Sequence, residues 1–270
     1  MIKKYALPGL VALGMVATSE AGLLESWSSY MWKTEQPKPP SVKVLVVKSK
    51  PGVVLEVKGK YKLYDPNTME HISTRFVGKR RYMQALSDGL RWGEQFPGIY
   101  QLLIVPDENG TTTLIDGVEY SGSLYVYDVG GKISVVNDVY VEDYIDSLLT
   151  GSGSGLMPEE ALGAMAIVDR TQAYYAANNP KTAFWALDGA KVGYEGHPNL
   201  PKSPRVENTL GTTKYMVLTE GDKPFNANWD NASITLDEAQ RLGAQGENAA
   251  QILKRAFPSA QLKVMLSNTQ

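Results

Sequence analysis

The chain contains no cysteine. This absence excludes disulfide bonds, cysteine-ligated metals and catalysis by a thiol. Histidine is scarce as well, because His71 and His197 are the only two in 270 residues. A serine triad would have to use one of them as its base, and neither lies in a recognisable catalytic motif. The pair also lacks the spacing typical of a metal site. We therefore expect surface or structural roles for both, and we predict neither a metal nor a cofactor.

Neither sign of charge dominates the sequence. There are 27 basic and 29 acidic residues, which gives a formal net charge of −2. This balance argues against a polyanion such as nucleic acid as the main partner. A hydrophobic fraction of 43% permits a sizeable core, in one large domain or two smaller ones.

Long apolar runs are missing too. The apolar stretch near the N-terminus covers only about residues 5–17 and contains Pro8, so it is too short for an ordinary membrane span. Two lysines precede it, and Ser19 and Ala21 fit the small-residue positions of a cleavage site. We predict an export signal over residues 1–21, cleaved after Ala21, with an uncleaved signal anchor as the alternative. Cleavage would change the net charge to −3 and place the mature protein in the periplasm or cell envelope.

The remainder of the chain predicts an α+β fold. Residues 22–40 end in a proline cluster that is typical of a linker. A β-rich N-terminal region is expected over residues 41–119, and strand patterns continue to about Tyr140. The pair Gly130–Gly131 lies between two alternating runs and predicts a hairpin.

The second half is predicted to be a mixed α/β core built around one prominent helix. Pro158 suits the first turn of that helix, and the acidic side chains of Glu159 and Glu160 favour its positive N-terminal end. Helical spacing of apolar residues then continues to Pro180. Near the C-terminus, Thr235 begins a predicted capping box and a second helical stretch that Gly243 and Gly246 interrupt, and a final strand follows it.

A glycine-serine loop, "TGSGSG" at residues 150–155, precedes the prominent helix. Loops of this composition can bind phosphate or carry a nucleophilic serine. No Gly-Lys-Ser/Thr follows, so the loop is not a P-loop. It does not spell Gly-x-Ser-x-Gly, so it is not a nucleophile elbow.

The segment Tyr120–Ile145 resembles the signature of the stage II sporulation protein D family, also called SpoIID/LytB. The matching signature residues are Tyr120, Gly122, Leu124, Val126, Val136, Asn137, Val139, Glu142, Asp143, Tyr144 and Ile145. Four later elements match in the same order. They are the helix start at Pro158 with Asp169–Ala173, the "VGYEG" segment Val192–Gly196, a run that contains Val206, Thr209, Gly211 and Leu218, and the ending Arg241–Pro258. The resemblance implies a SpoIID-like core over residues 120–270.

The resemblance also implies a function in the cell wall. Better-known members are lytic transglycosylases that cut peptidoglycan glycan strands stripped of their stem peptides. Such cleavage needs one carboxylic acid with a raised pKa, which first protonates the glycosidic oxygen and then acts as a base. The family name does not require that the source of this chain forms spores.

This sequence departs from the family at the acid. The family glutamate aligns with Ser152, or with Leu156 in a second alignment, and neither residue can donate a proton near neutral pH. The family's His-Ser-Thr element is replaced by Asn226–Ser233, and its Gly-His-Gly element is missing. The chain thus resembles a divergent member without the catalytic glutamate, a pseudoenzyme.

Other residues remain as candidates. Glu195 is the least constrained carboxylate that could replace the acid. Arg170 matches a family arginine and would contact sugar, or it forms a structural ion pair. Tyr194 and Trp229 would stack on sugar rings, or they pack in the core.

Three functional hypotheses follow. The first is an exported, peptidoglycan-associated protein that binds glycan strands or a cell-wall remodelling partner and has degenerate lytic activity. The second is an active lytic transglycosylase with a relocated carboxylate. The third is a purely structural interaction protein whose cleft has closed.

Overall fold

The computed structural model describes residues 40–151, 156–197 and 202–265. The predicted signal peptide and all of the predicted linker except Pro40 lie outside the described residues. Pro39–Gln270 forms one compact unit by its internal contacts. Among the described residues, no helix is both long and apolar enough to span a membrane.

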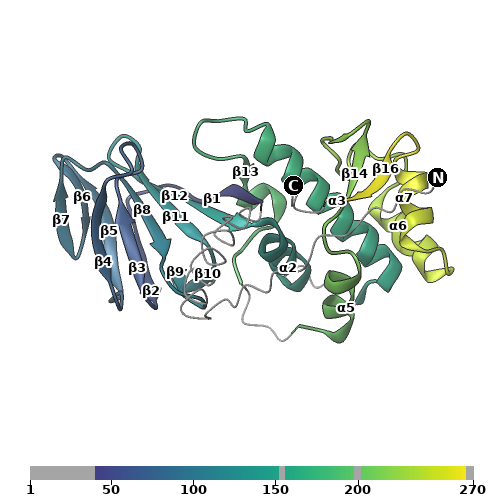
Figure 1. Cartoon of the computed structure of the whole chain (residues 1–270), viewed down its shortest axis with the longest axis horizontal. Coiled ribbons are helices and arrows are strands. Elements are labelled where there is room, and N and C mark those ends of the chain that lie inside the picture. The colour runs from purple at the N-terminus through teal and green to yellow at the C-terminus, as the bar shows by residue number, and fades with distance from the viewer. Residues whose placement is uncertain (1–39, 152–155, 198–201, 266–270) are drawn as a thin grey trace, which may run out of the picture. The chain divides into compact units, whose positions relative to one another are not determined.

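The described residues form an α+β fold with three sheets, as the sequence predicts (Figure 1). The seven-stranded sheet has the spatial order β13 (Leu187–Asp188), β1 (Ser41–Lys50), β12 (Ile133–Tyr140), β11 (Ser123–Asp128), β8 (Gln101–Pro106), β3 (Tyr61–Tyr64) and β4 (His71–Arg75). The six-stranded sheet has the order β10 (Val118–Tyr120), β9 (Thr112–Ile115), β2 (Gly52–Lys58), β5 (Arg81–Leu86), β6 (Gly89–Trp92) and β7 (Glu94–Pro97). The small sheet consists of β15 (Lys223–Pro224), β14 (Met216–Glu220) and β16 (Gln261–Val264).

The two larger sheets share one hydrophobic core. In β2, Val53, Leu55 and Val57 alternate with less buried residues, which is the pattern of a strand with one face inward. They pack in the same cluster as Leu63 of β3 and Leu124 of β11, which belong to the other sheet. Strands from both sides of the predicted boundary between residues 119 and 120 occur in the seven-stranded sheet, and the division into two regions stays a prediction.

Nothing in the sequence of residues 52–65 indicates that the two strands formed there, β2 and β3, lie in different sheets. The chain leaves β2 at Gly59, whose φ of 115° is open to glycine and unfavourable for other residues. It then enters β3 in the other sheet. The hairpin predicted at Gly130–Gly131 is confirmed, because β11 and β12 pair directly across it.

Helices gather at one end of the larger sheets (Figure 1). They are α2 (Val141–Gly151), α3 (Glu159–Asn178), α4 (Gly189–Val192), α5 (Pro204–Thr212), α6 (Leu236–Ala244) and α7 (Ala249–Ala256). The prominent helix predicted from Pro158 is confirmed as α3, with Pro158 at its N-cap. It contacts α2, α5, α6 and α7.

Only half of the predicted capping box at α6 is formed. The Thr235 hydroxyl accepts a hydrogen bond from the Glu238 backbone N–H, while the Glu238 carboxylate pairs with Arg241. A complete capping box starts α7 instead, where Asn248 and Gln251 bond reciprocally.

Candidate functional site

A cleft of about 570 Å³ lies between β10, the end of α2 and the segment that follows α4. It brings Tyr120, the first residue of the family-like signature, together with Gly193–Gly196 of the "VGYEG" segment. The residues lining it are Val46, Gly117, Val118, Glu119, Tyr120, Ser147, Gly151, Ala190, Gly193, Tyr194, Glu195, Gly196 and His197. The volume falls within the usual range for small-molecule sites.

Tyr194 anchors the wall of this cleft. Its hydroxyl donates to Asn137 Oδ1 at 2.7 Å, and Asn137 Nδ2 donates to the Ser121 carbonyl at 2.8 Å. The rings of Tyr120 and Tyr144 lie with their centroids 6.0 and 5.2 Å from that of Tyr194. Only 3% of Tyr194 is exposed, and burial raises the pKa of its hydroxyl. The predicted sugar-stacking role of Tyr194 stays a prediction, and the buried ring favours packing.

The next residues are fixed by backbone contacts. Gly196 has a φ of 76°, and a Cβ at this position would lie 2.5 Å from the Glu119 carbonyl oxygen. The His197 backbone N–H donates to that same carbonyl at 2.7 Å. The Ser147 hydroxyl of α2 donates to the Gly196 carbonyl. This close approach requires glycine at residue 196 and holds Glu195 at the cleft surface.

Glu195 is exposed to solvent in the cleft. Its carboxylate adds to the pKa of Tyr120, which burial, the main cause, raises to about 12. Tyr120 therefore keeps its proton near neutral pH and can donate a hydrogen bond. A catalytic acid is usually held in an apolar pocket, and Glu195 is not.

A second carboxylate, Glu119, is held in its charged form. It accepts hydrogen bonds from the Thr112 hydroxyl at 2.6 Å and from Lys58 Nζ at 3.3 Å. The Thr112 bond lowers the pKa of Glu119 most, and Lys58 and His197 add to the effect. A carboxylate that stays ionised accepts hydrogen bonds and does not protonate a leaving oxygen.

His197 contributes an imidazole to the cleft. Its Nε2 lies 2.9 Å from the Ser121 hydroxyl, which is 3.5 Å from Asp143 Oδ2 in α2. Sequence reasoning gave His197 a surface or structural role and did not assign Glu119 or Ser147 to a site. One signal was present, because His197 directly follows the family-like "VGYEG" segment.

The cleft therefore suits a ligand rich in hydroxyl groups. It offers two carboxylates, one imidazole and a protonated phenol as hydrogen-bonding groups. Across the described ranges, no group of three or more histidine or acidic side chains has an arrangement that could hold a metal ion.

Arg170 does not line the cleft. It lies in α3, is fully buried, and donates from Nε and Nη2 to both carboxylate oxygens of Glu142 at 2.8 and 3.0 Å. Its Nη1 donates to the carbonyls of Ala166 and Met216 at 3.4 and 3.3 Å. The sugar contact stays a prediction, and this geometry favours the structural ion pair.

Asp169, next to Arg170 in α3, has a carboxyl group with a pKa near neutrality. Burial raises the pKa of Asp169 to about 7, although the positive charge of Arg170 opposes this shift. Asp169 is not among the residues that line the cleft. Its proton is therefore not placed where a ligand in the cleft would receive it.

The other predicted site residues are not brought to Tyr194. Trp229 belongs to a separate cluster with α6 and α7, where its ring centroid lies 6.3 Å from that of Phe257. Its indole N–H is buried and has no hydrogen-bond partner in the described part of the chain. Ser152 lies outside the described residues, and Leu156, the alternative acid position, is 93% exposed.

The comparisons with known proteins agree with the signature. The family model described as "SpoIID: Stage II sporulation protein" matches residues 129–219. An uncharacterized protein of Chlamydia pneumoniae is 32% identical over 231 residues, which cover 84% of this chain and 83% of that protein. The chain belongs to the stage II sporulation protein SpoIID family.

Two further relatives have the same general name. An uncharacterized protein of Chlamydia muridarum is 29% identical over 235 residues, with 84% of this chain and 79% of that protein covered. An uncharacterized protein of Brachyspira hyodysenteriae is 31% identical over 179 residues, with 65% of this chain and 47% of that protein covered. Membership of the family suggests a function related to the cell wall.

Proposed function

We propose that the protein is exported and binds peptidoglycan glycan strands in the cleft around Tyr194 without cutting them. The observation that carries this proposal is the composition of the cleft. Tyr120 and Tyr194, from two family-like segments, line it, Asn137 of the signature holds Tyr194 in place, and hydrogen-bonding groups suited to hydroxyls complete the lining. Of its two glutamates, Glu119 is held ionised and Glu195 is exposed. A site of this kind can hold a saccharide, and none of the described residues that line it is a buried acid for the glycosidic oxygen.

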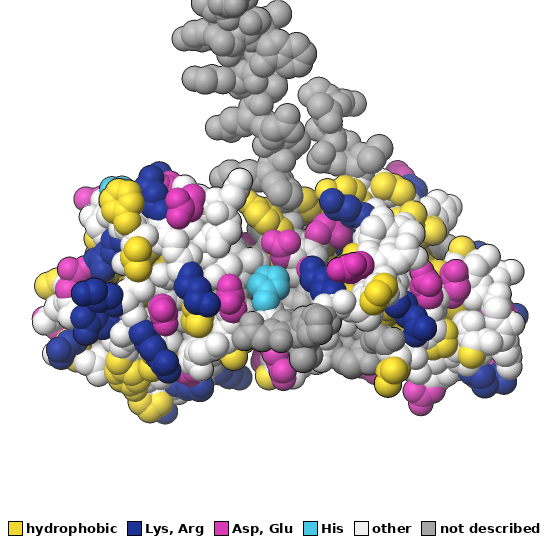
Figure 2. Space-filling model, turned by 90° about the horizontal axis from the view of Figure 1, so that it is seen from below, with side chains coloured by type: hydrophobic (Ala, Val, Ile, Leu, Met, Phe, Trp, Pro, Cys, Tyr) yellow, Lys and Arg dark blue, Asp and Glu magenta, His cyan; other side chains and the backbone are white. Residues whose placement is uncertain are grey.

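The charges on the surface fit an uncharged or weakly charged polymer. Figure 2 shows acidic and basic side chains interspersed over one face of the molecule. This mixture, with a net charge of −2 for the whole chain, gives no extended field of one sign to attract a polyanion. A cell-wall remodelling protein bound to the same cleft is the other partner compatible with this proposal.

The histidines provide a matched test of glycan binding. His197 lines the cleft, whereas His71 lies on β4 and bonds Thr74 at 3.0 Å. Co-sedimentation with denuded glycan strands should weaken for His197→Gln and stay unchanged for His71→Gln. Absence of binding by the unchanged protein, or equal weakening by both substitutions, would overturn the proposal.

One observation favours the second candidate, an active lytic transglycosylase. Glu195 is a carboxylate in the cleft, close enough to Tyr120 to affect its pKa. If Glu195 is the relocated acid, anhydro-sugar products will form and Glu195→Gln will abolish them. Glu207→Gln is the control, because Glu207 is also exposed, lies on α5 and does not line the cleft.

A further inference from the structure

A second pocket, of about 260 Å³, lies where the edges of the two larger sheets meet. Tyr61 of β3 and Arg75 of β4 come from the seven-stranded sheet, and Arg81, Trp92 and Glu94 come from β5, β6 and β7 of the six-stranded sheet. Val77, Lys79 and Gly93 complete its lining. The pocket lies outside residues 129–219, which match the family model, and it shares no lining residue with the cleft.

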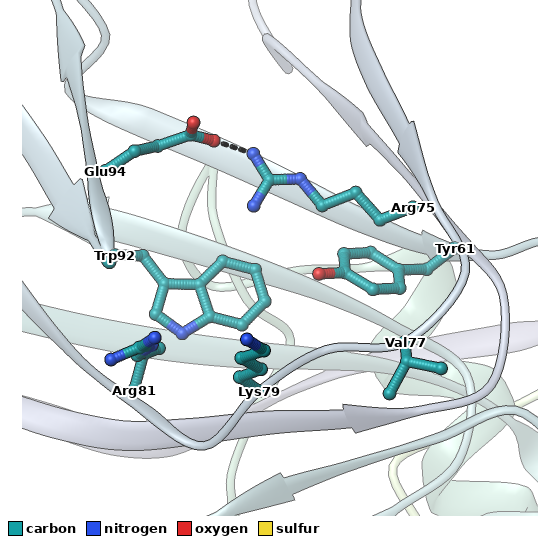
Figure 3. A pocket seen from close by; sticks show the side chains of 8 residues that line it. Tyr61, Arg75, Val77, Lys79, Arg81, Trp92 and Glu94 are labelled. Carbon is teal, nitrogen blue, oxygen red and sulfur yellow. Dashed lines mark ion pairs between the residues drawn. The ribbon is translucent and has the colours of Figure 1, made fainter.

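Aromatic rings form the floor of this pocket. Tyr61 and Trp92 are 1% and 3% exposed, and their ring centroids are 6.0 Å apart. Three cationic side chains, Arg75, Lys79 and Arg81, are directed toward the space around the Trp92 indole (Figure 3). A rigid apolar floor below cationic groups strengthens their attraction for an anion, because the low-dielectric wall limits screening by water.

The positive charge in this pocket is only partly neutralised. Glu94 forms an ion pair with Arg75 and is the only acid among the described residues that line the pocket. In the described part of the chain, the side chains of Lys79 and Arg81 have no hydrogen bond or ion pair. Three cations against one anion leave an excess of two positive charges within one concavity.

The existing ion pair shows which chemistry the pocket accepts. The Glu94 carboxylate comes from β7, in the other sheet, and meets the guanidinium of Arg75 on β4. Arg75 Nε is held by the Ser73 hydroxyl at 3.2 Å, so its orientation is fixed. Guanidinium groups bind carboxylate and phosphate through paired N–H donors. Phe76 and Val77, which are 71% and 76% exposed, lie next to this site in the chain and offer apolar contact to the rest of a ligand.

We infer that this pocket binds the oxyanion group, carboxylate or phosphate, of a small ligand through Arg75, Lys79 and Arg81. The ligand's oxyanion shares Arg75 with Glu94 and supplies the negative charge that Lys79 and Arg81 lack. The site is independent of the glycan cleft, so either one can exist without the other.

To test this, the purified full chain is titrated with inorganic phosphate and, separately, with acetate. Binding is monitored through the Trp92 indole signal in ¹⁵N NMR. We expect saturable shifts with at least one ion, and the ion that binds more tightly identifies the oxyanion class. Arg81→Gln should weaken binding about tenfold, the loss expected for one charge-assisted hydrogen bond. Glu94→Gln should strengthen binding, since it removes the competing carboxylate.

Arg80→Gln is the matched control. Arg80 neighbours Arg81, is also exposed and does not line the pocket. A specific site predicts that Arg80→Gln leaves binding unchanged. The inference is overturned if neither ion gives a saturable shift, if Arg80→Gln and Arg81→Gln have equal effects, or if Glu94→Gln binds no more tightly than the unchanged chain.

Discussion

The ion pair between Arg170 and Glu142 makes a sharp prediction about stability. Arg170 is fully buried, and the side chain of Glu142 is 23% exposed. Glu142→Gln keeps the shape and one acceptor oxygen but removes the negative charge, so a buried guanidinium loses its counter-charge. Breaking a buried pair in this way typically costs about 3–5 kcal/mol. The partial exposure of Glu142 places the expected loss near the lower end, at about 3 kcal/mol.

Urea unfolding followed by circular dichroism measures this loss as a change in the free energy of unfolding. Glu238→Gln is the control, because it breaks the exposed pair with Arg241 and should cost less than about 1 kcal/mol. Replacing both partners, with Glu142→Gln and Arg170→Met together, should restore part of the stability lost in Glu142→Gln. Equal losses for Glu142→Gln and Glu238→Gln would refute the structural role of Arg170.

Two further predictions concern α3 and the cleft. The folded-state pKa of Asp169, about 7, is above its usual value of 3.8, so its stabilising effect is present at low pH and is lost as pH rises through 7. Asp169→Asn should remove this pH-dependent loss of stability, which is less than about 4 kcal/mol because the side chain is only half-buried. Melting temperatures of both proteins across pH 4–9 measure the loss. A difference between the two proteins that stays constant with pH would show that this reasoning is wrong. Gly196→Ala should destabilise by roughly 1–3 kcal/mol and weaken glycan binding, because its Cβ would meet the Glu119 carbonyl. Gly193→Ala is the control, because Gly193 has a φ of 70° and open space around it, and this substitution should cost about 1 kcal/mol of stability. Thermal melts in which Gly193→Ala destabilises more than Gly196→Ala would contradict the close contact between residue 196 and the Glu119 carbonyl.

Much of the fold could be predicted from local patterns. β1, the hairpin of β11 and β12, and α3 all have strong local signals, in alternation, paired glycines and an N-terminal proline. The sequence predicted a β-rich region over residues 41–119 but did not distinguish strands β4–β7 within it. They are only four to six residues long, and β4 has no fully buried residue, so their burial does not alternate clearly.

The candidate site was less accessible to sequence reasoning because it depends on distant contacts. His197 and Ser121 are 76 residues apart in the chain, and Tyr194 bonds Asn137 across 57 residues. The signature identified Asn137, Glu142 and Tyr144, and the fold shows why they occur together. Asn137 and Tyr144 fix Tyr194, and Glu142 neutralises Arg170. No local pattern predicts such pairings, since they depend on the register of β10–β12 and the placement of α2.

Incubation of the purified protein with denuded peptidoglycan strands tests the central claim most directly. The bound fraction is measured by co-sedimentation, and the supernatant is analysed for anhydro-sugar products by mass spectrometry. We expect retention of the protein on the strands, weakened by His197→Gln, with no anhydro products. Release of anhydro products that Glu195→Gln abolishes would contradict the claim that the cleft binds without cutting, and failure of the protein to bind would contradict the claim that the cleft holds glycan.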